Sequence, residues 1–135
     1  MADARRIWLA VPAIALFATD VAMTLRGQSA EYWSGQFDLV VEGNPVAKPI
    51  LASSPWLFLG LSVAWALLLL SAISLWKHRV ANGLARLVAF GHAIGAASWM
   101  LNGPLGWAGV IVFLIIASEL SARCWRRAEA NSNVE

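Results

Sequence analysis

The chain has little charge, little histidine and almost no cysteine. Of its 135 residues, 13% are charged, two are histidine and one, Cys124, is cysteine. A single cysteine excludes an intrachain disulfide. Two histidines, without an H-E-x-x-H motif or a histidine–cysteine cluster, do not make a recognisable metal site. The sequence also lacks a Gly-x-Ser-x-Gly elbow and a glycine-rich phosphate loop, so it indicates no catalytic residue and no cofactor.

Most residues of the chain are apolar. Hydrophobic residues make up 59% of the chain and the mean hydropathy is +0.64, unlike an ordinary water-soluble domain. A helical span takes about 20 apolar residues, so the chain has room for four. We therefore predict an all-α membrane protein with one domain, residues 1–127, and a disordered tail, residues 128–135. The four transmembrane helices are expected at about 7–25, 56–76, 80–101 and 105–122.

Most basic residues lie on one side of the predicted spans. They precede the first span, separate the second from the third and follow the fourth: Arg5, Arg6, Lys77, Arg79, Arg123, Arg126 and Arg127. Cationic flanks stay on the cytoplasmic side. Both termini are therefore expected in the cytoplasm, with the chain in the inner membrane of a prokaryotic cell. None of these segments carries interleaved aromatic residues, so the expected partner is the lipid bilayer and not a nucleic acid.

The first apolar run has a second interpretation, as a cleaved signal peptide. Two arginines precede an apolar core from Ile7 to Ala18, and small residues follow near Ser29 and Ala30. The apolar sequence continues past this core to Leu25, which favours an uncleaved membrane anchor.

Residues 26–55 form the one long loop, which is expected outside the cytoplasm. Asn44-Pro45 and Ser54-Pro55 are both typical helix starts, in which a capping residue precedes a proline. One helix from 45 to 76 would be about 48 Å long, too long for a hydrocarbon core of about 30 Å. We therefore expect a short interfacial or re-entrant helix at 45–53 and a break near Pro55.

Three aromatic residues of this loop are expected at the membrane surface. They are Tyr32, Trp33 and Phe37. Amphipathic rings are favoured at the level of the lipid headgroups, so the loop is expected to lie flat on the membrane.

Small residues recur along the third span. Alanines fall at four-residue steps, at Ala81, Ala85, Ala89, Ala93 and Ala97, beside a Gly91-x-x-x-Gly95 pair. Rows of small residues let membrane helices approach closely. We expect this span to be the central packing helix.

An acid lies inside the first apolar run. An ionisable group at membrane depth costs several kcal/mol and is retained with a partner or a purpose. At 1.5 Å per residue, Asp20 lies about 20 Å from the cytoplasmic end of its span and His92 about 18 Å. The two are expected to meet, with Ser62 in the same layer.

Several interpretations of this pair stay open. It can be a structural hydrogen bond between helices. It can also be a proton or cation site, because histidine exchanges protons near neutral pH. The two side chains can also fail to meet. A metal ion would need a further ligand, for which Glu42 is the candidate, and the identity of any metal stays unknown.

Arg86 and Glu119 are the other charged residues within the spans. They lie about 9 Å and 5 Å from the cytoplasmic ends of the third and fourth spans. We expect them to form a structural ion pair or to extend to the membrane surface.

A short motif precedes the second span. Asp20-x-x-x-Thr24 in the first span is followed, after the loop, by Glu42-x-Asn44-Pro45. In this motif, which covers roughly residues 15 to 76, the chain resembles a family of small prokaryotic membrane proteins with no assigned activity. The resemblance implies that Asp20, Thr24, Glu42, Asn44 and Pro45 form one cluster at the outer mouth of the bundle. The loop here is longer than the family pattern.

The first functional prediction is a non-enzymatic membrane protein. It would act through self-association or as an accessory subunit of a larger membrane complex. The alternative is a small proton-coupled carrier or ion-conducting unit that uses Asp20, as a dimer because four helices enclose little pathway. In form this is similar to the small multidrug carriers, which have four spans and a carboxylate in the first. A metal-dependent or intramembrane enzyme is a third, less favoured interpretation.

Overall fold

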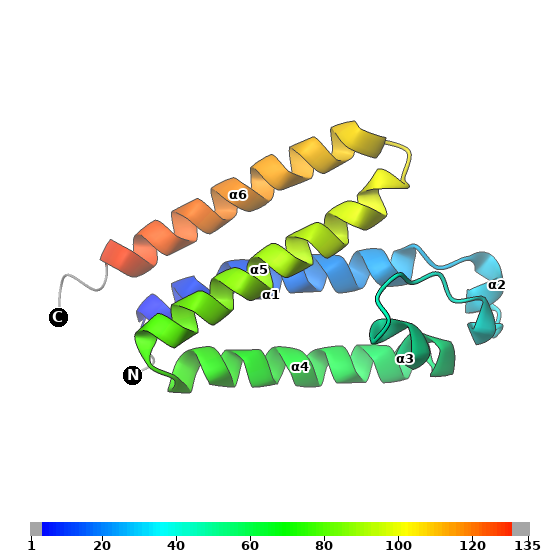
Figure 1. Cartoon of the computed structure of the whole chain (residues 1–135), viewed down its shortest axis with the longest axis horizontal. Helices are drawn as coiled ribbons and strands as arrows, with labels where there is room; N and C mark the ends of the chain where they lie inside the picture. The colour runs from blue at the N-terminus through cyan, green and yellow to red at the C-terminus, as the bar shows by residue number, and fades with distance from the viewer. Residues whose placement is uncertain (1–3, 131–135) are drawn as a thin grey trace.

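The computed structural model describes residues 4–130, which form helices and loops without a β-strand. Four helices are long and apolar enough to cross a membrane: α1 (Ala4–Arg26), α4 (Pro55–Leu75), α5 (His78–Leu101) and α6 (Gly106–Ala130). The prediction of an all-α chain with four candidate spans is confirmed. Both ends of the chain lie at one end of the bundle, here called the termini end, and the segment between α1 and α4 lies at the other, the loop end (Figure 1).

The α1–α5 pair forms the centre of the bundle. α1 and α5 pack on each other, and each also contacts α4 and α6. Within the described chain, α4 and α6 do not touch and instead flank the pair. The third span was predicted to be the central helix, and it shares this position with α1. The two central helices approach closely because alanines face each other across the contact.

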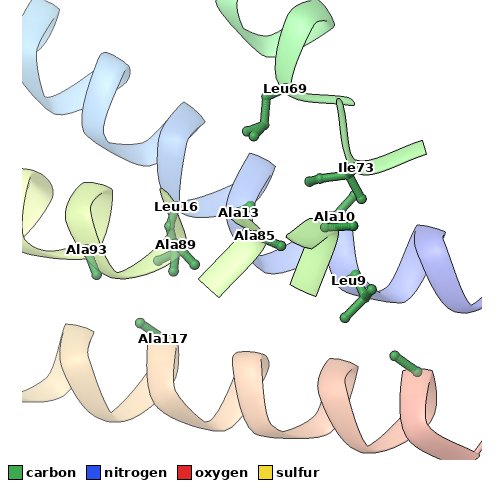
Figure 2. Packing of buried hydrophobic residues seen from close by; sticks show 12 residues of the cluster. Leu9, Ala10, Ala13, Leu16, Leu69, Ile73, Ala85, Ala89, Ala93 and Ala117 are labelled. Atoms are coloured by element: carbon green, nitrogen blue, oxygen red, sulfur yellow. The ribbon is translucent and has the colours of Figure 1, made fainter. Parts of the chain in front are cut away.

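The buried core lies in the part of the bundle toward the termini end. Figure 2 shows its side chains, which come from all four long helices and include Leu16 of α1, Leu69 of α4, Ala89 of α5 and Ala117 of α6. The whole alanine row of α5 is buried: Ala81, Ala85, Ala89, Ala93 and Ala97. This alanine row therefore packs against helices of the same chain.

The start of α4 follows the predicted capping chemistry. The Ser54 hydroxyl accepts the backbone N–H of Trp56 at 3.1 Å, and Pro55 occupies the first helical turn. A separate short helix, α3 (Ala47–Ser53), precedes it. The break near Pro55 is thus present. α3 begins two residues later than predicted because Asn44 Oδ1 accepts the N–H of Val46 at 2.9 Å and closes a turn first.

The rest of the loop folds into two more short elements, α2 (Ala30–Trp33) and the 3₁₀ helix η1 (Phe37–Leu39). Tyr32 is fully buried, so its predicted place among the lipid headgroups is wrong. Its hydroxyl donates to the carbonyl of Leu51 at 3.0 Å and ties α2 to α3. Burial raises the pKa of the Tyr32 hydroxyl, which keeps it a donor. Trp33 remains half exposed.

α6 is longer than predicted. Its helix continues to Ala130, so residues 128–130 are not a disordered tail; residues 131–135 lie outside the described chain. The extra turns carry Glu129 to the level of Arg86, with Arg86 Nη2 3.5 Å from Glu129 Oε1. The Arg86 guanidinium also lies over the Trp125 ring, 4.7 Å from its centroid.

The prediction that Arg86 pairs with Glu119 is wrong, because Arg86 pairs with Glu129 in the last turns of α6 instead. Glu119 lies ten residues before Glu129, about 15 Å nearer the loop end at helical rise. Its Oε1 atom instead pairs with Arg123 Nε at 2.6 Å and lies 3.9 Å from Arg126 Nη2. Both of these pairs are exposed and lie along α6 itself.

Candidate functional site

Asp20 and His92 meet between the two central helices. Asp20 Oδ2 lies 2.8 Å from His92 Nδ1, and the side chains are 20% and 26% exposed. Phe17, one turn before Asp20, packs edge-on against the imidazole, with ring centroids 4.9 Å apart. A carboxylate only accepts hydrogen bonds, so either Nδ1–H donates to it or the protonated carboxyl donates to Nδ1. In both cases one exchangeable proton lies between the two groups.

Gly95 makes room for the Asp20 carboxylate. A Cβ atom at residue 95 would lie 2.5 Å from Asp20 Oδ2 and 2.6 Å from Oδ1. No side chain fits at that distance, so only glycine lets the carboxylate reach α5 at this level. The Gly91-x-x-x-Gly95 spacing by itself predicts only a packing role for Gly95. Its spacing from His92, less than one helical turn, was the signal that it faces the same neighbour.

A polar cavity opens above this pair at the loop end. Its volume is about 730 Å³, and residues of α1, α4, α5 and the loop line it. The five predicted site residues all line it: Asp20, Thr24, Glu42, Asn44 and His92. Other polar lining residues are Lys48, Ser62, Ser98 and Asn102. The cavity is thus large enough for a small ligand and its water.

Glu42 and Asn44 make their hydrogen bonds within the loop. Glu42 Oε1 accepts the Asn44 N–H at 2.7 Å, and Asn44 Oδ1 caps the turn before α3. These bonds explain the Glu-x-Asn-Pro spacing as a turn that forms one cavity wall. Among residues 4–130, no three His, Cys, Asp or Glu side chains lie close enough to hold a metal ion. The structure therefore does not bring Glu42 to the Asp20–His92 pair as a third ligand.

Gln28 holds the loop over the cavity and was missed by the sequence analysis. Its buried side chain forms three hydrogen bonds to backbone groups. Nε2 donates to the carbonyls of Thr24 and Val41, both at 2.8 Å, and Oε1 accepts the Val41 N–H at 2.9 Å. The Gln28 amide thus bonds both backbone groups of Val41, as a neighbouring β-strand would. It thereby holds the backbone directly before Glu42. A lone glutamine after a helix carries no sequence signal for this role.

Replacing Gln28 by alanine is expected to loosen the loop. The substitution removes the three hydrogen bonds of the Gln28 side chain, at a net cost of about 0.5–1.5 kcal/mol for each bond. Limited proteolysis should cut the Gln28→Ala variant within residues 34–46 faster than the wild type. Gln36→Ala is the matched control, because Gln36 lies exposed in the same loop. Equal cleavage of the two variants would show that Gln28 does not hold the loop.

The cavity is open on one side and closed on the other. Toward the loop end, its lining includes the exposed residues Asn44 and Lys48. Toward the termini end, the buried core begins within one or two helical turns, at Leu16, Leu69 and Ala89. The lining thus connects Asp20 with exposed residues at the loop end, whereas packed apolar side chains lie on its other side.

Cysteine labelling tests this access. In a chain with Cys124→Ser, we expect Ser62→Cys to react with a small charged methanethiosulfonate added at the loop side. Val63→Cys should not react, although Val63 is 53% exposed and Ser62 only 8%. Val63 faces lipid, where a thiol does not ionise, whereas Ser62 lines the cavity. Faster reaction at residue 63, or reaction at residue 62 only from the termini side, would contradict a water-filled cavity open at the loop end.

The charges around the cavity favour a cation. Asp20 and Glu42 contribute two carboxylates, against one ammonium from Lys48. With both carboxylates ionised and the imidazole neutral, the lining carries a net charge of −1, that is −2 + 1, which attracts cations.

Comparisons with known protein families, with curated proteins and with solved structures give no match for this chain.

Proposed function

We propose that this protein is a small proton-coupled carrier or cation-conducting unit of the cell membrane, with Asp20 and His92 as its proton and cation site. The observation that carries the proposal is the 2.8 Å contact of this pair at the base of a polar cavity. A carboxyl and an imidazole that share one proton can release it to solvent or exchange it for a cation.

The charge distribution supports an orientation for this process. Basic residues gather at the termini end, and the loop contains three acids against two bases. By the positive-inside rule, the termini end faces the cytoplasm and the cavity opens outside the inner membrane. The site would then load from outside. Transport further requires the α1–α5 contact below Asp20 to open, or a second copy of the chain to complete the pathway.

Self-association as the primary role has less support. The alanine row that motivated it is buried against neighbouring helices of the same chain. Association of copies through another face stays a prediction, and it is compatible with a dimeric carrier.

Proton flux into liposomes tests the proposal. Purified protein is reconstituted into vesicles that contain a pH-sensitive dye, and the outside is acidified in the presence of a potassium diffusion potential. We expect acidification of the interior to be faster than in protein-free vesicles, and to change when an inward or outward gradient of small cations is imposed. A rate equal to that of protein-free vesicles, with and without a cation gradient, would overturn the proposal.

A further inference from the structure

A second hollow, the apolar groove, lies between α1 and α6 at the loop end. Its volume is about 850 Å³. Most of its lining is hydrophobic and includes Met23, Leu105, Val112, Phe113 and Ile116. From the start of α6 to Ile116 is ten residues, or about 15 Å, which is half of a hydrocarbon core of about 30 Å. The groove therefore spans the depth of one leaflet.

The groove exists because α6 packs closely only from Ala117 onward. Four of its five buried residues lie there: Ala117, Ser121, Cys124 and Ala128. Before Ala117, α6 buries only Val110, and the ribbons of α1 and α6 diverge toward the loop end (Figure 1). Gly27, Ala108 and Gly109 also line the groove, and the Trp99 ring of α5 occupies the space beside Gly27. The groove is partly open at the surface of the bundle, where lipid would surround the helices.

One cation stands at the mouth of the groove. Arg26 is the last residue of α1, is exposed, and lines the groove. Among residues 4–130, its guanidinium makes no ion pair and no side-chain hydrogen bond. Arg26 ends a helix that is long and apolar enough to cross a membrane, and the end of such a helix would lie at the level of the lipid phosphates. Guanidinium and phosphate form paired, charge-assisted hydrogen bonds.

We propose that the apolar groove binds one phospholipid from the leaflet at the loop end. An acyl chain lies between α1 and α6, and the phosphate pairs with Arg26. Basic pockets between transmembrane helices recognise lipid headgroups by the same chemistry. This site does not depend on the function proposed for Asp20 and His92. The substitutions that test the groove, at Arg26 and Val112, leave that pair unchanged.

Native mass spectrometry of the purified protein in detergent tests the site, with phosphatidylglycerol as the titrated lipid. We expect Arg26→Gln and Val112→Trp each to lower the apparent affinity for the first bound lipid about fivefold or more. Two controls should bind as the wild type does. Arg79→Gln removes an exposed arginine at the termini end, and Ile111→Trp alters a residue that is 56% exposed, as Val112 is, but lies outside the groove.

A second comparison uses the unaltered chain. Diacylglycerol with the same acyl chains lacks the phosphate and should bind about fivefold more weakly than phosphatidylglycerol. Retention of wild-type affinity by either Arg26→Gln or Val112→Trp would overturn the proposal. Equal losses in all four variants, or equal binding of diacylglycerol, would also overturn it, because the lipid would then be held without this site.

Discussion

Replacing Asp20 by asparagine is expected to reduce proton flux through reconstituted protein by roughly tenfold or more, toward the rate of protein-free vesicles. Asparagine has nearly the same shape and its amide oxygen can still accept a hydrogen bond from His92 Nδ1, 2.8 Å away in the wild type. It cannot take up or release a proton. The fold should therefore survive while the exchange step is lost.

The control for this variant is a carboxylate outside the cavity. Glu119 lies exposed on α6 and pairs with Arg123. Glu119→Gln removes one acid from the same chain without touching the α1–α5 contact, so its flux should equal that of the wild type. Unchanged flux in Asp20→Asn, or an equal loss in both variants, would contradict a role for Asp20 in proton movement.

Replacing Gly95 by alanine is expected to destabilise the bundle and to separate Asp20 from His92. The new methyl carbon would lie 2.5 Å from Asp20 Oδ2, so α1 and α5 must move apart or the carboxylate must turn away. Overpacking and the loss of the Asp20–His92 contact cost about 1–3 kcal/mol, which outweighs the gain of about 0.5–1 kcal/mol from alanine inside a helix. We therefore expect a lower unfolding temperature in detergent together with a loss of proton flux.

Gly91 provides the matched control on the same helix. A Cβ atom there meets nothing within 4 Å. Gly91→Ala should then keep its flux and gain stability, because alanine is favoured over glycine inside a helix by about 0.5–1 kcal/mol. If Gly95→Ala were as stable and as active as Gly91→Ala, the close approach of Asp20 to α5 would be refuted.

The four spans could be predicted because the bilayer imposes their length and composition. Hydropathy located α4 and α5 to within two residues of the observed ends. It failed at the end of α6, where the final turns are polar. Those turns are held by contacts such as Arg86 with Glu129, which a search for apolar runs does not detect.

The level of Asp20 and His92 along their helices could be predicted, but the contacts around them could not. The level of Asp20 and His92 follows from the constant rise of a helix. The fit of Gly95 against the carboxylate depends on how far apart two helices pack, and the three bonds of Gln28 depend on how a loop folds back. The burial of Tyr32 likewise depends on α3 lying beside α2. None of these distances is encoded in local periodicity.

The contact between Asp20 and His92 can be measured directly by nitrogen-15 NMR of histidine-labelled protein in lipid nanodiscs. The chain has only two histidines, His78 and His92, so a His78→Gln variant assigns both rings. We predict that Asp20→Asn shifts the His92 ring nitrogen signals, and that in the wild type these signals respond to the pH of the solution. The His78 signals should not respond to Asp20→Asn. Ring signals of His92 that are the same in the wild type and in Asp20→Asn, and that stay constant with pH, would contradict a proton-exchanging pair.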